Sequence, residues 1–226
     1  MSKNIFQPLD LIVPFWKPTD WTSFDVVKKV KNQIRPNKVG HSGTLDPFAE
    51  GVLVLCIGKK TKESEKLMAL NKEYIATIQL GAETDSLDIT GKVINELPVP
   101  EFSNEKINSI LDGFIGESFQ IPPMFSALKK NGIRLYKLAR KGIEVKREPR
   151  KIFIYNIELI NFDKNQITIK VECGKGTYIR TLAKDIAEKL GTCGYLSQLS
   201  RTKVGHYTAY NSIQIENLNE WLSTIA

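Results

Sequence analysis

Residues 40–58, GHSGTLDPFAEGVLVLCIG, combine a glycine-framed loop with an uninterrupted apolar run. Glycine reaches positive φ without a steric cost, so the three glycines among the twelve residues 40–51 indicate a shaped loop. Pro47 fixes its own φ and pushes Asp46 toward extended backbone, while the run over 51–58 predicts a buried strand. The pattern therefore holds one carboxylate on a stiff turn. Either Asp46 performs chemistry there, or it only accepts hydrogen bonds from backbone N–H groups of the turn.

Length and composition indicate an ordinary globular protein. A chain of 226 residues with 42% apolar and 25% charged residues can bury a sizeable core. No window approaches the run of about 18 apolar residues that a membrane span needs, and the N-terminus has no signal-peptide pattern. We therefore expect a cytoplasmic protein without membrane contact. Three distant cysteines without a CxxC pair, and only two histidines, favour reduced thiols in the core over a disulfide framework or a metal site.

Positive charge is concentrated in one segment of the chain. The net charge is +7, yet residues 129–151 alone hold ten Lys or Arg and two acids, so the remainder nets about −1. Apolar residues interleave with these charges, which is not typical of a disordered basic tail. A folded basic arm of this kind fits a phosphate backbone, and a solvated charged surface is the alternative.

Helical and strand periodicities follow one another along the chain. We expect helices at 22–34, at 61–70, from about 104 to 112, at 176–191 and near the C-terminus, and strands at 51–58, 72–81 and 195–204. A hairpin-like stretch surrounds Gly91, and two long runs flanking DKN at 163–165 predict an antiparallel hairpin. The first helix has a Thr-Ser cap, ends before a proline, and places at helical spacing Phe24, Val27, Val30 and Ile34.

Two further faces are predicted to be apolar. One side of the strand at 72–81 carries Tyr74, Ala76, Ile78 and Leu80, and one stripe of the helix at 176–191 carries Ile179, Leu182, Ala183, Ile186 and Leu190. Adjacent strands in the sequence favour an α+β fold with a mixed, mostly antiparallel sheet flanked by helices. We expect a single domain over 1–226 that includes the basic arm, at about 122–150, as an insertion.

Five sequence blocks together resemble the TruB-type tRNA pseudouridine synthases, which isomerise a uridine in the T-loop of tRNA. The blocks are KP…TS at 17–23, GHSGTLDPFAEGVLVLCIGKKTK at 40–62, KEYIATIQLGAETDSLDITG at 72–91, IPPMFSALKKNGIRLYKLARKG at 121–142 and GTYIRTLAKDI at 176–186. They follow the family order and span nearly the whole chain. Taken singly, Tyr74 fits a half-buried strand aromatic and Arg180 a surface cation, but the five blocks together favour chemistry at Asp46.

The resemblance implies a pseudouridine synthase fold and an isomerase acting on the T-loop uridine at position 55 of tRNA. It implies that Asp46 is catalytic, that Arg180 pairs with it, and that Tyr74 lies against the target base. Further roles follow from the family for Tyr178 as a second uridine contact, His41 near the extruded base, Lys62 as an active-site lysine and Leu199 as a pocket residue. The basic arm is similar to the family's RNA-gripping insertion, and its expected phosphate contacts are Lys129, Lys130, Arg134, Arg140, Lys141 and Arg147.

The chemistry is consistent with these roles. The N1–C1′ bond must break, the uracil must turn, and C5 must rejoin the sugar, so the base has to leave its stack. A carboxylate can attack C1′, add to the uracil ring or assist a glycal route, and a guanidinium beside it favours its ionised form. Because the reaction is an isomerisation, we expect no metal and no redox cofactor. The expected partner is the T-arm of tRNA, and the protein is expected to act as a monomer.

Two features depart from the family pattern. Asp20 occupies the position of the usual glycine in KPTDWTS, and we expect it to accept a left-handed turn with some strain. Few residues follow RTKVGHYT, so we expect no C-terminal PUA-type domain. Two other functions stay open on the sequence: a tRNA-binding folding factor, and an isomerase of another structured RNA.

Overall fold

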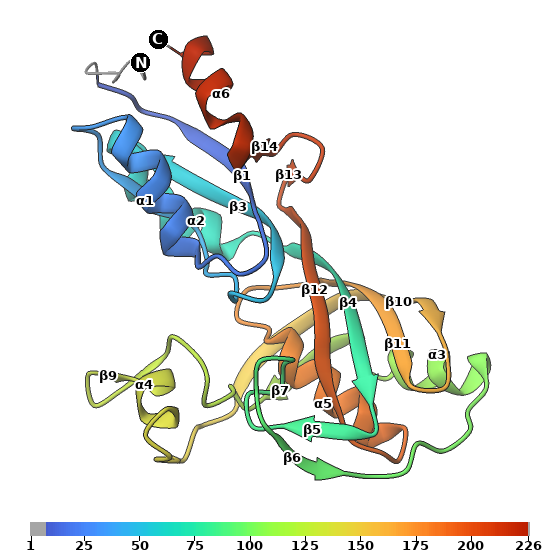
Figure 1. Ribbon diagram of the computed structural model, residues 1–226. Helices are drawn as coiled ribbons and strands as arrows, with labels where there is room; N and C mark the ends of the chain where they lie inside the picture. The colour runs from blue at the N-terminus through green and yellow to red at the C-terminus, as the bar shows by residue number, and fades with distance from the viewer. Residues whose placement is uncertain (1–7, 226) are drawn as a thin grey trace. The chain divides into compact units, whose positions relative to one another are not determined.

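The structure, a computed structural model, describes residues 8–225 and divides them into two compact units (Figure 1). The first unit holds the described residues up to 75 together with those from 199 onward, and the second holds residues 76–198. The chain passes between the units inside two strands, β4 (Lys72–Leu80) and β12 (Gly194–Val204). Each unit is described by itself below.

The first unit is a sheet with helices on both faces. Its strands β1 (Ile12–Lys17), β2 (Val39–His41), β3 (Glu50–Ile57), β13 (Tyr207–Thr208) and β14 (Ile213–Gln214) join β12 in the order β14-β1-β3-β12, with β2 on β3 and β13 on β12. β1 pairs with β14, and β3 with β12, in parallel, whereas the other pairs are antiparallel. The helices are α1 (Ser23–Gln33), the 3₁₀ helix η1 (Gly58–Glu63), α2 (Ser64–Ala69), the 3₁₀ helix η2 (Ile215–Asn217) and α6 (Leu218–Thr224).

Alternate residues of the buried strand β3 face two separate clusters. Leu53 and Leu55 pack with residues of α1 and α6, and Val52, Val54 and Cys56 pack on the other face with Leu67 of α2. All residues of β3 after Glu50 are buried, as the apolar run at 51–58 predicts. A strand buried on both faces is a rigid support, and the glycine-framed loop leads directly into it.

The second unit has a strand order β12-β4-β11-β10-β7, built from β7 (Gly116–Gln120), β10 (Arg150–Phe162) and β11 (Gln166–Cys173) with the two shared strands. β10 is antiparallel to both β11 and β7. Two helices, α3 (Asn104–Asp112) and α5 (Ile179–Lys189), accompany this sheet, and α3 contacts β10 and α5. A separate hairpin is formed by β5 (Ala82–Thr84) and β6 (Val93–Glu96). The basic arm contributes β8 (Lys129–Lys130), β9 (Ile133–Arg134) and α4 (Leu135–Ala139), which form a lobe beside these elements in Figure 1.

The predicted α+β class with a mostly antiparallel mixed sheet is confirmed, and so are the main elements. Thr22 caps α1 in a capping box with Asp25, and the expected apolar stripe of α5 is buried. The expected helix at 61–70 begins as the 3₁₀ helix η1 and continues as α2. One position is wrong: Phe24 is 68% exposed, because the buried side of α1 is formed by Val26, Val27, Val30 and Ile34 instead.

Three expectations concern the cysteines, membrane crossing and a signal peptide. The three cysteines are buried, as expected of core thiols. None of the helices within residues 8–225 has the length and apolar character that a membrane crossing requires. The expected absence of a signal peptide depends in part on residues 1–7, which lie outside the described residues.

Candidate active site

Asp46 is half-buried on a loop whose backbone is fastened at several points in the first unit. The Ser42 N–H donates to the Val54 carbonyl at 3.0 Å, and the Ala49 N–H donates to the Asp46 carbonyl at 3.2 Å, which closes a turn around the aspartate. Ser23, the first residue of α1, accepts from the Leu45 N–H at 2.9 Å through its Oγ. The position of the carboxylate is therefore set by β3 and by the start of α1.

Lys17 is fully buried and holds the same loop from the end of β1. Its Nζ donates to the carbonyls of Pro18 (2.7 Å), Trp21 (2.6 Å) and Pro47 (3.2 Å). Burial lowers the pKa of Lys17 to about 8, and the charge of Asp46 partly opposes this shift. The lysine therefore places a positive charge beside the aspartate while satisfying three backbone acceptors.

Asp20 accepts the left-handed conformation that the family pattern assigns to glycine. Its φ is +63°, and its N–H donates to the Pro47 carbonyl at 2.8 Å. Aspartate visits this region more readily than most residues, so the expectation of a left-handed turn is confirmed. The Pro47 carbonyl thus accepts two hydrogen bonds, one from the Lys17 Nζ and one from the Asp20 N–H.

Arg201 of β12 fastens the other side of the loop. Its guanidinium is buried and donates to the carbonyls of Val52 (2.8 Å), Gly43 (3.3 Å) and Thr44 (3.4 Å). Gly51 lies opposite Arg201 in the parallel β3–β12 pairing with a φ of +125°, and a Cβ there would collide with the Arg201 backbone. Only glycine permits this close approach, which explains why the loop ends in a glycine.

The other site residues predicted for the first unit have different surroundings. Tyr74 on β4 and Leu199 on β12 are buried, while Lys62 in η1 is exposed. His41, at the end of β2, is partly buried, and its Nδ1 is a buried atom without a hydrogen-bond partner among the described residues. Burial lowers the pKa of His41, so its imidazole is neutral at pH 7.

Arg180 belongs to the second unit, at the start of α5, and is 4% exposed. It donates to the carbonyls of Ser86 (2.9 Å) and Phe125 (2.7 Å) and forms an ion pair with Asp88 at 3.2 Å. A surface cation, the alternative for Arg180 on the sequence alone, is therefore excluded. Asp46 and Arg180 lie in different units, and the pairing that the family resemblance implies stays a prediction.

Asp88 was not assigned a role from the sequence, although it lies within the block at 72–91. Its carboxylate is buried and accepts from the Ser86 hydroxyl (2.7 Å), the Thr90 hydroxyl (2.6 Å) and the Thr90 N–H (3.0 Å), besides Arg180. Such a network fixes the orientation of the guanidinium. The only signal in the sequence was the density of small polar residues in TDSLDITG, which is also typical of a surface turn.

Tyr178 caps the N-terminus of α5 and is held by its backbone. The Tyr178 N–H donates to the Gln120 side chain at 2.8 Å, and the Gln120 amide donates back to the Tyr178 carbonyl at 3.1 Å. Gln120 is buried at the end of β7. The ends of β7 and α5 are thereby joined, and the family-implied contact of Tyr178 with uridine remains a prediction.

The basic arm is a folded element, in agreement with its interleaved apolar residues. Leu135 is buried, and its N–H donates to the Leu128 carbonyl at 2.7 Å. A hollow of about 510 Å³ is lined by Lys129, Gly132, Ile133, Arg134, Tyr136 and Lys137. Three of these residues are cations, so the hollow is suited to an anionic group.

The six residues of the arm that are predicted to contact phosphates differ in their exposure and in their contacts within the protein. Lys129, Arg134 and Lys141 are exposed. The Lys130 Nζ donates to the Lys146 carbonyl at 2.7 Å, and Arg140 lies over the Tyr136 ring at 5.6 Å. Arg147 is partly buried, bound to Glu144 at 2.9 Å and to the Pro122 carbonyl at 3.3 Å, which makes it a structural cation within the arm.

Comparison with known proteins defines the class. Residues 31–179 match the model of the TruB family pseudouridylate synthase N-terminal domain, and residues 180–225 match the tRNA pseudouridylate synthase B C-terminal domain. The class is therefore that of the pseudouridylate synthases. Within it, the chain belongs to the TruB family.

Individual relatives agree with this assignment. The chain is 48% identical to tRNA pseudouridine synthase B of Clostridium tetani over 92% of its own length and 72% of the relative, and 43% identical to that of Bordetella avium over 96% and 90%. A solved Cbf5-Nop10-Gar1 complex contains a chain with a TM-score of 0.73 at 28% identity, covering 93% of this chain. This chain spans about half, 54%, of that structural relative. A structure of an H/ACA RNP bound to a substrate RNA shares the fold at a TM-score of 0.69 and 24% identity.

No group of three or more His, Cys, Asp or Glu within residues 8–225 is arranged to hold a metal ion.

Proposed function

We propose that this protein is a tRNA pseudouridine synthase that converts the T-loop uridine at position 55 of tRNA to pseudouridine. The observation that carries the proposal is the fastening of the Asp46 loop by buried cations. Lys17 and Arg201 donate to six different backbone carbonyls in and around this loop. A turn that only needed to close would not require two buried cations at this cost of desolvation. Membership of the TruB family supports the same role for the aspartate.

The reaction needs one carboxylate and no net change in atoms. The N1–C1′ bond breaks, the uracil turns, a C5–C1′ bond forms, C5 loses its proton, and N1 gains one. Asp46 supplies an ionised carboxylate that stabilises the electron-poor centre formed when the glycosidic bond breaks, whether it bonds to C1′, bonds to the ring, or assists a glycal route. Lys17 favours the ionised form by its charge.

The remaining site residues bind the extruded base in this proposal. His41, which is partly buried at the end of β2, occupies the space that the base leaves. Tyr74 and Tyr178 contact the uridine, Leu199 lines its pocket, and Lys62 and Arg180 supply positive charge. The buried network of Asp88 supports a fixed orientation for Arg180.

The basic arm binds the T-arm backbone in this proposal. Its exposed cations around the hollow of about 510 Å³ support phosphate contacts, which position the RNA without reading its sequence. The proposal includes a monomeric protein that acts in the cytoplasm, where its substrate is found. Sedimentation of the purified protein with and without tRNA tests the first of these two points.

The decisive experiment is incubation of the purified protein with an unmodified tRNA transcript, followed by pseudouridine mapping at nucleotide resolution. We expect modification of the T-loop uridine by the wild type, and no product from Asp46→Asn with RNA affinity within a few-fold. The amide is nearly isosteric, so the loop persists while the charge is lost. Asp112→Asn, an exposed position at the end of α3, is the matched control and should retain full activity.

The two other functions predict different results. A tRNA-binding folding factor would bind the transcript and accelerate its folding equally well with Asp46→Asn, with no pseudouridine in either sample. An isomerase of another structured RNA would leave the T-loop uridine unmodified, and mapping of total RNA from cells lacking the protein would then identify its substrate. Substantial turnover by Asp46→Asn would refute the assignment of the aspartate.

A further inference from the structure

The outer face of α1 differs from an ordinary solvated helix surface. Phe24 is 68% exposed there, although the other apolar residues of α1, Val26, Val27 and Val30, are buried in the core. Lys28 and Lys31 follow Phe24 at intervals of four and three residues, so these three side chains lie along one line of the helix surface, and Arg35 follows just beyond the end of α1. An exposed aromatic ring followed by two aligned lysines and a further arginine is a pattern that burial in the core cannot explain.

Within residues 8–225, none of these cations is bound in an ion pair, although the charge of Lys28 acts on the nearby Asp25. Among the described residues, no ion pair joins Lys28, Lys31 or Arg35 to a carboxylate. The acid of the helix, Asp25, accepts from the Thr22 hydroxyl and the Thr22 N–H in the capping box, which lowers its pKa. The positive charge of this face is therefore available to an anionic partner, in a protein whose charge outside the basic arm is close to zero.

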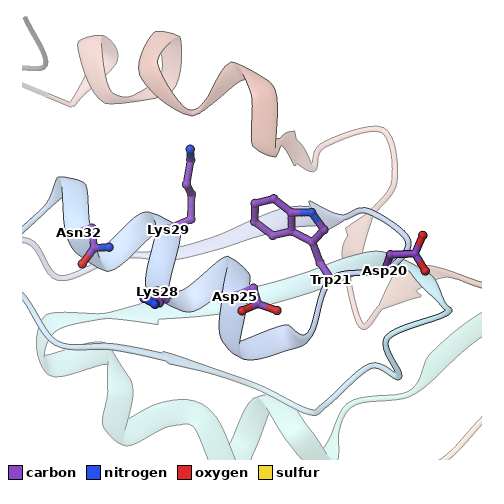
Figure 2. A pocket seen from close by; sticks show the side chains of 6 residues that line it. All are labelled: Asp20, Trp21, Asp25, Lys28, Lys29 and Asn32. Carbon is purple, nitrogen blue, oxygen red and sulfur yellow. The ribbon is translucent and has the colours of Figure 1, made fainter.

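A hollow of about 370 Å³ lies along the same helix (Figure 2). It is lined by Asp20, Trp21, Asp25, Lys28, Lys29 and Asn32, and Figure 2 shows the Trp21 indole and Lys29 projecting to the same side of α1. The indole is only partly buried against the core cluster that contains Leu218 and Leu222. The hollow thus offers an aromatic surface together with two carboxylates, Asp20 and Asp25, and two lysines, Lys28 and Lys29.

The basic face begins at the catalytic loop. Ser23 bonds to the Leu45 N–H beside Asp46, and Lys17 joins the carbonyls of Trp21 and Pro47. From Ser23, α1 extends for 11 residues, roughly 16 Å at about 1.5 Å per residue. A nucleic acid with one nucleotide at Asp46 can therefore continue along α1 within the same unit.

We infer that the outer face of α1 is a second RNA-binding surface, separate from the basic arm, in which Lys28, Lys31 and Arg35 contact phosphates and Phe24 contacts a base or ribose. The inference rests on the proposed function, because it takes the substrate of the Asp46 loop to be RNA. It adds a path for the RNA that leaves the catalytic loop along the first unit, whereas the basic arm belongs to the second.

Other partners fit this face less well. Protein–protein interfaces are depleted in lysine at their centre, and this face has three lysines around its hollow and its line of cations. A helix that lies on a membrane inserts a broad apolar side, but the apolar side of α1 is buried under α6 and against β3, which leaves Phe24 alone. Aligned cations with one aromatic ring match the combination by which proteins follow a nucleic acid strand.

The test is a salt titration of binding to the same unmodified tRNA transcript. The α1 variant carries Lys28→Gln, Lys31→Gln and Arg35→Gln, and a control variant of equal charge carries Lys106→Gln, Lys164→Gln and Lys189→Gln at exposed positions of the second unit. Each lost phosphate contact lowers the log–log salt slope by about 0.7–0.9, so we expect the α1 variant to flatten it by about 2–3 units. At 0.1 M salt this corresponds to a loss of affinity of about five- to eightfold per contact.

Phe24 is tested separately, because an aromatic contact does not depend on salt. Phe24→Ser should weaken binding at least about fivefold without changing the salt slope, and Phe24→Tyr should restore it. Unchanged unfolding curves for all variants are expected at these exposed positions. The control variant should lose less than one slope unit.

Distinct results separate this inference from the proposed function. Equal salt slopes and affinities for the wild type and the α1 variant would overturn the second surface, even with normal pseudouridine formation by both. An equal loss in the control variant would also overturn it, because the effect would then reflect net charge alone. Failure of the wild type to modify the transcript, with an intact α1 effect on binding, would overturn the proposed function and leave the RNA-binding surface in place.

Discussion

Replacing Lys17 with methionine removes a buried charge that holds the Asp46 loop while leaving a side chain of similar length. The Nζ of Lys17 donates to three carbonyls at 2.6–3.2 Å, and a hydrogen bond from a charged donor contributes about 1.5–3 kcal/mol. The three bonds together thus stabilise the fold by about 4.5–9 kcal/mol. Their loss is partly offset because the variant no longer buries a charge, a penalty that lowers the pKa of Lys17 to about 8. The lowered pKa corresponds to an offset of about 3 kcal/mol, so we expect a net loss of about 1–6 kcal/mol in the free energy of unfolding.

The same lysine gives the stability a defined pH dependence. Its pKa is lowered from 10.5 in the unfolded chain to about 8 in the fold, so between these values the unfolded state binds more protons. Stability of the wild type therefore rises with pH from about 8 toward 10.5, and the methionine variant lacks this contribution. After allowance for solvent screening, the destabilisation by Lys17→Met should be about 1–2 kcal/mol larger at pH 9.5 than at pH 7.

Chemical denaturation at the two pH values and single-turnover kinetics measure these effects. We expect turnover to fall at least about tenfold, equivalent to about 1.4 kcal/mol in the barrier, with RNA affinity nearly unchanged, because Pro47 beside Asp46, the proposed catalytic residue, loses one of its two donors. Lys72→Met is the matched control: Lys72 is also buried and donates to the carbonyls of Met68 and Leu70. A Lys17→Met protein as stable and active as the wild type, beside a destabilised Lys72→Met, would refute the reasoning.

Three further predictions concern binding, the target base and the frame of the loop. Tyr74→Phe should retain RNA affinity but lose turnover, whereas Tyr74→Leu should lose about 1–3 kcal/mol of binding as well; equal and near-normal rates for both would make Tyr74 a core aromatic only. Replacing Lys129, Lys130 and Lys141 by glutamine should flatten the salt slope of tRNA binding by up to about 2–3 units without changing which uridine is modified, and an unchanged slope would favour a solvated surface. Gly51→Ala should destabilise the protein by roughly 3 kcal/mol, measured by thermal unfolding, because the added Cβ would collide with the Arg201 backbone and because the φ of Gly51 is +125°. The control is Gly132→Ala, which is also at positive φ but has open space around it, and it should destabilise the protein less.

Local signals in the sequence predicted most of the elements. The cap of α1, the stripe of α5 and the apolar run of β3 depend on residues close together in the chain, and each was found where it was expected. The left-handed Asp20 was predictable for the same reason, since a positive φ depends on the residue itself and its immediate neighbours. The family blocks identified Asp46 in the same way, because the loop around it is continuous in sequence.

The contacts that hold the site could not be predicted, because they join residues far apart in the chain. Lys17 reaches the carbonyl of Pro47, 30 positions later, and Arg201 reaches that of Gly43, 158 positions earlier. In the sequence both are ordinary cations of a basic protein, and nothing local marks them as buried.

The tertiary structure also decided which polar residues are buried and which apolar residues are exposed. Arg180 and Asp88 form a buried pair, although either would fit a surface turn by its sequence alone, and Phe24 is exposed although its spacing suited the core. A residue becomes buried or exposed according to which strand or helix packs against it, and that depends on strand order and register. The sequence by itself therefore determined the local elements and the glycine-framed loop around Asp46. Only packing between distant segments decided which charges are buried around that loop and which face of α1 is left exposed.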